Sequence, residues 1–218
     1  MIFEISKKEM SFIKKRLFTL ALCIIMAFTM GMSAFAEGTP QWIEGETIVV
    51  DLTYEEFVEK TAELNEISEE EAIQLIDEMR RSTAPNGVTA YTDVIEHYQS
   101  VSKTFTYSKN SNYRAESVAT LLLRGKGSYF QIEGVSGCAT RIGAGTSTAS
   151  WVQLYNNYHA TFPSSSIDFS GSGYFSDSVT SSTGVSVGIE GFNYSHSSGN
   201  TFTYYSDTMN LIWTYRTY

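Results

Sequence analysis

Residues 52–81 combine charged positions with apolar positions that recur every three or four residues, the spacing of amphipathic helices. Thr53 with Glu56, and Ser68 with Glu71, match capping boxes, in which a hydroxyl accepts a hydrogen bond from a backbone N–H of the first helical turn. Asn65 suits the left-handed conformation that ends a helix. The sequence therefore predicts two helices joined as a hairpin. Their apolar faces consist of Tyr54, Phe57, Val58 and Leu64, and of Ala72, Ile73, Leu75, Ile76 and Met79.

Beyond Pro85-Asn86-Gly87 the apolar residues alternate with Ser, Thr and Gly, which is the period of half-buried strands. Turn residues recur about every ten positions, as in antiparallel sandwiches and barrels. The long strand predicted over 152–162 contains Asn156-Asn157, where we expect a bulge. Residues 91–101 are the one stretch of this region whose apolar spacing could form a helix. The predicted strands cover residues 101–107, 113–123, 129–133, 152–162, 167–175, 185–189, 202–204 and 209–215.

These patterns predict an α+β fold in three parts. Residues 1–36 form a signal peptide, residues 37–87 an acidic helical hairpin and linker, and residues 88–218 an antiparallel β domain. We expect the β domain to be a sandwich, with a β-barrel as the alternative.

The amino-terminal segment has the pattern of a secretory signal peptide. Three bases, Lys14 to Arg16, precede an apolar run over residues 17–28, and Ala34-Phe35-Ala36 follows. We expect export and cleavage after Ala36, which leaves 182 of the 218 residues outside the cytoplasm. An uncleaved membrane anchor is the alternative, because about 20 apolar residues can span a bilayer. Met10 is an alternative start to Met1.

Charge and cysteine content limit the environment and the partners. Residues 37–82 hold 14 acidic and three basic residues, a net charge of −11, whereas residues 83–218 hold eight and seven. An acidic segment repels nucleic-acid phosphates and anionic lipids, so we expect neither as a partner. Cys138 is the single cysteine left after cleavage, which excludes an internal disulfide and fits a bacterial exporter better than an animal one.

No pattern of residues predicts catalysis or a cofactor. His97, His159 and His196 lack the spacing of a zinc site, and no aspartate-rich loop suggests calcium. Cys138, His159 and Asp168 occur in an order that some thiol enzymes use, but Cys138 is predicted in a loop after Gly134-Val135-Ser136-Gly137, with no helix amino end to ionise it. We therefore expect a protein that is not an enzyme, with no catalytic, cofactor or metal-binding residues.

Aromatic residues are the remaining candidates for function. Tyr and Trp give rigid amphipathic contacts to carbohydrate or protein when they are exposed. We expect Trp213 to lie in the core, because it alternates with polar residues in the last predicted strand. Trp151 and Tyr155 are the candidate ligand contacts.

The stretch from Ser164 to Tyr205 is long, alternating and nearly uncharged, and residues 164–183 contain 11 Ser or Thr. In composition it resembles the membrane-inserting hairpins of aerolysin-type pore-forming toxins. That resemblance implies strands that pair all their backbone groups in a closed membrane barrel.

The sequence thus favours a secreted, non-catalytic bacterial module that contacts a protein, a glycan or a cell-wall surface. The alternatives are a toxin or bacteriocin-like membrane-active protein, for which a membrane would be the partner, and an unrecognised hydrolase. We expect the acidic hairpin to be an integral part of the fold, with Phe57, Ile73 and Ile76 packed on the sheet. In the toxin alternative it would instead be a pro-segment removed by cleavage near Arg80-Arg81.

Overall fold

The computed structural model describes residues 42–82, 94–146 and 149–217, excluding the side chain of Trp42. The predicted signal peptide over residues 1–36 and its cleavage site lie outside the described residues. Among the residues that are described, no helix combines the length and hydrophobicity needed to cross a membrane.

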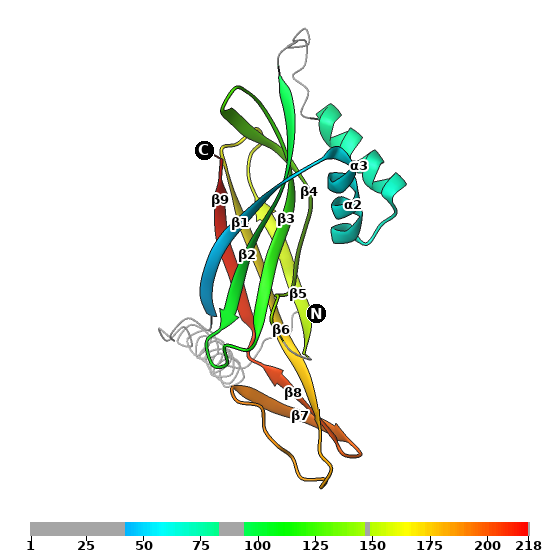
Figure 1. Ribbon diagram of the computed structural model, residues 1–218, viewed down its shortest axis with the longest axis vertical. Helices are drawn as coiled ribbons and strands as arrows, with labels where there is room; N and C mark the ends of the chain where they lie inside the picture. The colour runs from blue at the N-terminus through cyan, green and yellow to red at the C-terminus, as the bar shows by residue number, and fades with distance from the viewer. Residues whose placement is uncertain (1–41, 83–93, 147–148, 218) are drawn as a thin grey trace, which may run out of the picture. The chain divides into compact units, whose positions relative to one another are not determined.

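Most of the described chain forms antiparallel β-sheets, and two short helices accompany them (Figure 1). The first sheet has the order β1-β2-β3-β4, with β1 at Trp42–Leu52, β2 at Ile95–Tyr107, β3 at Arg114–Lys126 and β4 at Tyr129–Ile142. The second has the order β5-β6-β8-β7, with β9 also paired to β6. Its strands are β5 at Ser150–His159, β6 at Ser166–Thr180, β7 at Phe192–Ser198, β8 at Thr201–Ser206 and β9 at Met209–Arg216.

The long strand β6 serves two parts of the second sheet. Its first half pairs with β9, from Ser166 opposite Arg216 to Gly173 opposite Met209. Its last five residues, from Ser176 to Thr180, pair with β8 instead. The strands β6, β8 and β7 therefore continue beyond β9 as a three-stranded distal extension, seen at the lower end of Figure 1.

The main hydrophobic core joins the two sheets. Val101, Phe105 and Leu121 from the first sheet cluster with residues of the second sheet such as Phe169 and Trp213. Trp213 stacks on Phe169 with ring centroids 4.7 Å apart, and its Nε1 donates to Ser117 Oγ across the sheets at 2.9 Å. The alternating burial of β9 confirms the prediction that Trp213 is a core residue.

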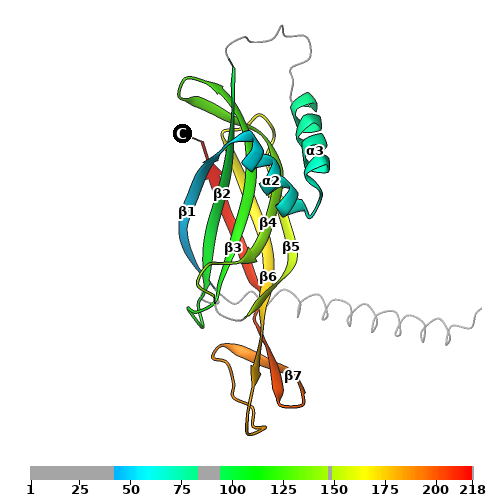
Figure 2. The ribbon, with the colours of Figure 1, turned by 45° about the vertical axis from the view of Figure 1, so that its right-hand side comes forward.

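The helical hairpin packs on part of the outer face of the first sheet (Figure 2). It consists of α2, Tyr54–Asn65, and α3, Glu69–Ser82. Both predicted capping boxes form: Thr53 N donates to Glu56 Oε2 at 2.8 Å, and Ser68 N donates to Glu71 Oε2 at 2.9 Å. A second buried cluster under the helices contains Phe57, Val58, Ala62, Ala72, Ile76 and Leu122.

Two predictions about the hairpin were wrong in detail. The left-handed residue that ends α2 is Glu66, at φ 56°, and Asn65 instead donates to the Ser136 carbonyl of β4 at 2.8 Å. Ile73 does not pack on the sheet, because its side chain is 39% exposed, whereas Phe57 and Ile76 are fully buried.

The segment predicted as hairpin and linker also contains a strand. β1 pairs with β2 along the edge of the first sheet, from Trp42 opposite Tyr107 to Leu52 opposite Tyr98. Ile48, Val49 and Val50 are consecutive and each about half exposed, so the strand has no alternation of apolar and polar residues that the sequence could display.

Five further features differ from the prediction. Residues 134–138 lie inside β4 instead of in a loop, and residues 185–189 form no strand. β5 ends at His159, before residues 160–162, and its irregularity lies between Gln153 and Tyr155 instead of at Asn156-Asn157. The described part of 91–101 is strand from Ile95 onward, because it pairs with β3 along its whole length.

Candidate functional site

The edge strands β4 and β5 of the two sheets meet along a seam that side chains close. Thr140 N donates to Gln153 Oε1 at 2.7 Å, and Asn156 Nδ2 donates to the Cys138 carbonyl at 2.7 Å. These bonds satisfy backbone groups that an open sheet edge would leave free to pair with another strand. The seam is therefore held in a fixed geometry by residues of β5.

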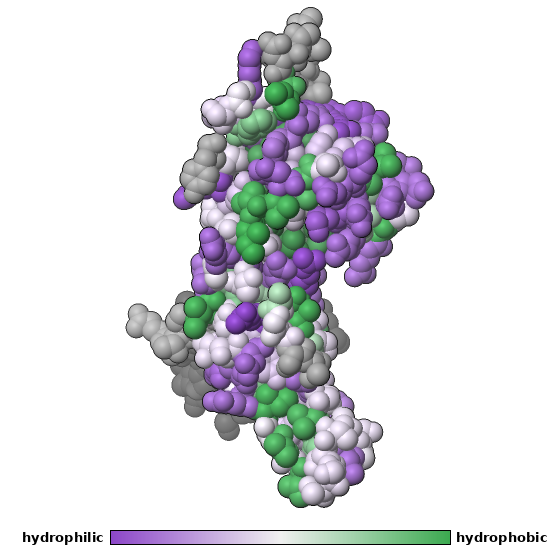
Figure 3. Space-filling model, viewed as in Figure 1, coloured by the Kyte–Doolittle hydropathy of each residue, from purple (hydrophilic) through white to green (hydrophobic). Residues whose placement is uncertain are grey.

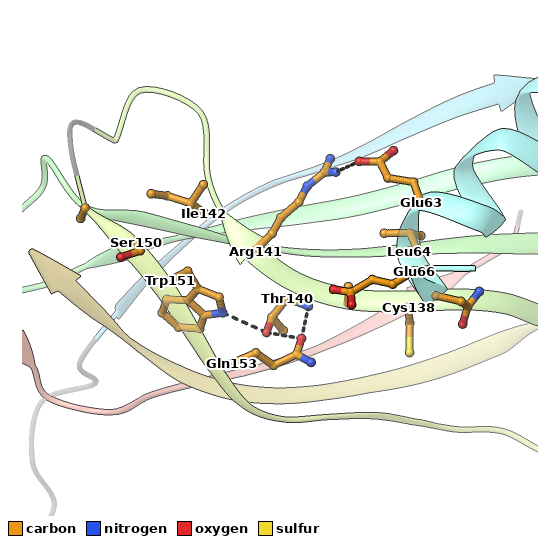
Figure 4. A pocket seen from close by; sticks show the side chains of 13 residues that line it. Glu63, Leu64, Glu66, Cys138, Thr140, Arg141, Ile142, Ser150, Trp151 and Gln153 are labelled. Atoms are coloured by element: carbon orange, nitrogen blue, oxygen red, sulfur yellow. Dashed lines mark hydrogen bonds and ion pairs between the residues drawn. The ribbon is translucent and has the colours of Figure 1, made fainter. Parts of the chain in front are cut away.

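A groove of about 820 Å³ lies at one end of this seam, where the carboxyl end of α2 approaches β4 and β5. Figure 4 shows Trp151 and Gln153 on β5 at one side and Glu63 at the other, with Thr140 and Arg141 of β4 between them. The helix approaches β4 closely because Gly137 has no side chain: a Cβ there would lie 2.9 Å from Asn65 Nδ2 and 3.0 Å from Leu64 Cβ.

Trp151 is fixed in the wall of this groove. Its Nε1 donates to Thr140 Oγ1 at 3.0 Å, and its ring meets the edge of Phe175 with centroids 5.0 Å apart. The indole lies across Gly173, where a Cβ would collide with it. Trp151 is only partly buried by these contacts, so its orientation is preorganised while part of its surface lines the groove.

Charged side chains line the opposite wall of the groove. Arg141 Nη1 binds Glu63 Oε1 at 3.1 Å, and its Nε donates to Glu116 Oε2 at 2.9 Å. The guanidinium is thus held between a helix and a neighbouring strand. Glu66, the left-handed residue at the end of α2, adds a second exposed carboxylate to the groove. The site offers an indole, amides and charged groups, the mixture that orients a polar ligand in a protein pocket.

The structure separates the two predicted ligand contacts. Trp151 is opposite Phe175 and faces the core side of the second sheet, whereas Tyr155 is opposite Ser172 and its hydroxyl lies 3.4 Å from Ser170 Oγ on the outer side. Regular alternation would place residues 151 and 155 on the same face, but the irregularity between Gln153 and Tyr155 reverses it. Trp151 lines the groove, and Tyr155, 48% exposed, belongs to a different surface.

The residues of the hypothetical thiol triad do not converge. Burial raises the pKa of the Cys138 thiol, and the hydrogen bond from Asn156 Nδ2 to Sγ, 3.0 Å long, offsets only part of that effect. His159 and Asp168 are cross-strand partners, but their face of the second sheet is the one opposite to Asn156. Thr214 donates to the Asp168 carboxylate at 2.6 Å. A neutral, half-buried thiol is a poor nucleophile.

In the described ranges, no group of three or more His, Cys, Asp or Glu side chains is placed to hold a metal ion. The polar groove residues that the sequence did not single out are Gln153, Arg141, Thr140, Glu63 and Glu66. Each is one polar residue among many in the sequence, and their meeting depends on how the helix and the two sheet edges pack.

Family models, curated proteins and solved structures were all compared with this chain, and none of the three comparisons gave a match.

Proposed function

We propose that this protein is a secreted, non-catalytic binding module and that its ligand occupies the groove between α2, β4 and β5. The observation that supports this proposal is the partly exposed Trp151 indole, fixed by Thr140, Phe175 and Gly173 in a groove of about 820 Å³. Pockets of several hundred Å³ that combine an aromatic side chain with a few oriented polar groups are the usual form of a ligand site.

The proposed fold and export of the chain fit a binding function. We interpret the two sheets with their shared core as a β-sandwich, and we propose that a bacterium exports the chain after cleavage at Ala36. A sandwich exposes its edges and loops while its core stays rigid, so a groove at a seam between sheet edges suits recognition outside the cell. The candidate partners are a protein, a glycan or a cell-wall surface.

A blocking substitution in the groove tests the proposal. Ile142 is 37% exposed, lines the groove and lies outside the buried core cluster, so Ile142→Arg should fill the groove without disturbing the core, and we expect at least a tenfold loss of affinity. The measurement is sedimentation with purified cell walls, together with titration against soluble wall oligosaccharides and secreted proteins. In a Trp42→Phe background the fluorescence change reports on Trp151, because Trp213 is buried.

Tyr155→Ala is the matched control, since Tyr155 lies on the other face of the second sheet. We expect its affinity to stay within about twofold of the unaltered protein, as for a surface residue outside the interface core. Loss of binding in Tyr155→Ala with none in Ile142→Arg would move the site to the outer face of that sheet and contradict the assignment to the groove.

A membrane-active role is the second proposal, and one observation favours it. The distal extension is nearly uncharged, its strand β7 is exposed along almost its whole length, and it differs in Figure 3 from the hydrophilic surface of the helical hairpin. At its base Tyr113 donates to Asp177 at 2.7 Å and Tyr107 donates to the Gly191 carbonyl at 2.7 Å. Insertion into a bilayer would require these bonds to break.

Limited proteolysis separates the two proposals. We expect cleavage after Arg80 or Arg81 to lower thermal stability without releasing dye from phosphatidylcholine–phosphatidylglycerol vesicles, because β1 and α2 stay paired and packed on the first sheet. The uncleaved protein serves as the control. Dye release that appears only after cleavage would support a pro-segment and the membrane-active role instead.

A further inference from the structure

The seam between β4 and β5 contains a second pocket, of about 400 Å³, beyond the groove already described. Its wall is mostly apolar and includes Leu75 and Met79 of α3, Val135 of β4, and Tyr158 and Phe162. Leu75 is 37% exposed, so an apolar side chain on the helix surface faces open space here. Exposed apolar side chains gathered around a hollow are a feature of sites that take an apolar group.

The two pockets lie in line along the seam. β4 contributes residues 138–142 to the first groove and residues 133–135 to the second pocket. On the other side of the seam, residues 149–151 and 153 line the first groove, and residues 158 and 162 line the second pocket. The helical hairpin borders both, with the carboxyl end of α2 at the first and the second half of α3 at the second. Thr140 and Val135 are five positions apart along β4, a distance of roughly 17 Å. An extended ligand of about five residues would reach both pockets.

Carboxylates dominate the charge along this line. Glu63 and Glu66 line the first groove, and Glu78 and Glu133 line the second pocket. The one base among the lining residues of both is Arg141, which is already held by Glu63 and Glu116. The field along the seam therefore favours positive charge, and three of its four carboxylates belong to residues 37–82, whose net charge is −11.

We propose that the seam binds an extended cationic segment of a partner polypeptide, with its basic side chains beside Glu63, Glu66 and Glu78 and an apolar side chain in the pocket of Leu75, Val135 and Phe162. This inference rests on the proposed binding function and names its ligand class. A neutral glycan could donate hydrogen bonds to the carboxylates, but it gains no charge–charge attraction from them and has no apolar side chain for the second pocket. The segment lies over the seam and does not extend the sheet at Thr140 and Cys138, since Gln153 and Asn156 already bond those backbone groups.

Selection from a phage library of randomised ten-residue peptides tests the ligand class. We expect the binders to be enriched in Lys and Arg, with one apolar residue within about five positions of the basic residues. Their affinity should fall as salt rises, because exposed charges are screened. Enrichment of acidic or uncharged sequences, or no enrichment at all, would overturn the inference. If cell-wall glycans bound to the unaltered protein and Ile142→Arg abolished that binding, the proposed binding function would stand and the cationic ligand class would be wrong.

Matched variants test the placement of the selected peptide. Glu66→Gln with Glu78→Gln removes two exposed charges from the seam, and we expect at least a fivefold loss of affinity at low salt. Glu55→Gln with Glu59→Gln removes the same charge from exposed positions on α2 that line neither pocket, and we expect less than a twofold change. An equal loss in both double variants would mean non-specific attraction to the acidic hairpin and would contradict the site. Leu75→Asn should cost at least fivefold, and no change there would exclude the apolar pocket.

Discussion

Replacing Phe57 with alanine should lower the free energy of unfolding by about 3–5 kcal/mol, the usual cost of a large aromatic truncation in a core. Phe57 is fully buried between the helical hairpin and the first sheet, and it stacks on Tyr98 with ring centroids 4.8 Å apart. The cluster around it is small, and α3 and β3 face each other across it through Ile76 and Leu122. The buried residues around the cavity left by alanine belong to helices and to β3, so the hairpin should loosen from the sheet.

The measurement is urea unfolding followed by circular dichroism, with Ile73→Ala as the control. Ile73 belongs to the same hairpin but is 39% exposed, so its truncation should cost less than about 1 kcal/mol. Equal effects of the two substitutions would contradict the packing of the hairpin on the sheet. A Phe57→Ala protein that unfolds with the stability of the unaltered chain would favour a hairpin that is easily removed.

Replacing Glu96 with alanine should cost about 2–3 kcal/mol at neutral pH, because it leaves two partly buried guanidinium groups without their shared carboxylate. Glu96 Oε2 lies 2.9 Å from Arg80 Nη2 of α3, and Oε1 lies 2.8 Å from Arg124 Nη2 of β3. Tyr98 joins the network by donating to Glu96 at 2.9 Å and accepting from Arg80 at 2.7 Å. The same carboxylate thus fastens α3 to the sheet.

The pH dependence of stability follows from this carboxylate. Burial alone would raise the pKa of Glu96, but hydrogen bonds from Arg124 and Tyr98 and the charges of both arginines outweigh it, so the pKa lies below its ordinary value. A lowered folded-state pKa stabilises the protein above the unfolded-state pKa of about 4.3, and that contribution is lost as the pH falls through the folded-state pKa. The stability of the unaltered chain should therefore fall toward that of the Glu96→Gln variant as the pH drops below about 4.3.

Asp77→Asn is the control for both measurements. Asp77 also binds Arg80, at 3.3 Å, but its side chain is 51% exposed, so its loss should cost less than about 0.5 kcal/mol. A double-mutant cycle of Glu96→Gln with Arg80→Met isolates the pair. A coupling energy near zero in that cycle would show that Arg80 acts through its other contacts, such as the Tyr54 ring at 4.9 Å from the centroid and the Tyr98 hydroxyl, and not through Glu96.

Local patterns predicted well those elements whose determinants are close in sequence. The capping boxes at Thr53 and Ser68 form as expected, because each needs only residues three positions apart. The last strand was equally clear, since Leu211, Trp213 and Tyr215 alternate with exposed residues on a strand that has one buried face. In contrast, β1 escaped prediction because it lies at a sheet edge with both faces partly in solvent.

By itself, the sequence determined the two helices, the change to strands after Pro85, the position of Trp213 in the core and the charge difference between residues 37–82 and the rest. Each follows from the period of apolar residues or from composition, which are properties of neighbouring positions. Only the tertiary structure decided which polar residues meet. It placed Glu63, Arg141, Thr140 and Trp151 around one groove. Tyr155 lies on the other face of the second sheet because a single irregularity in β5 reverses the alternation of side chains. Such contacts join residues far apart in the chain, and their geometry is set by how sheet edges and helices pack.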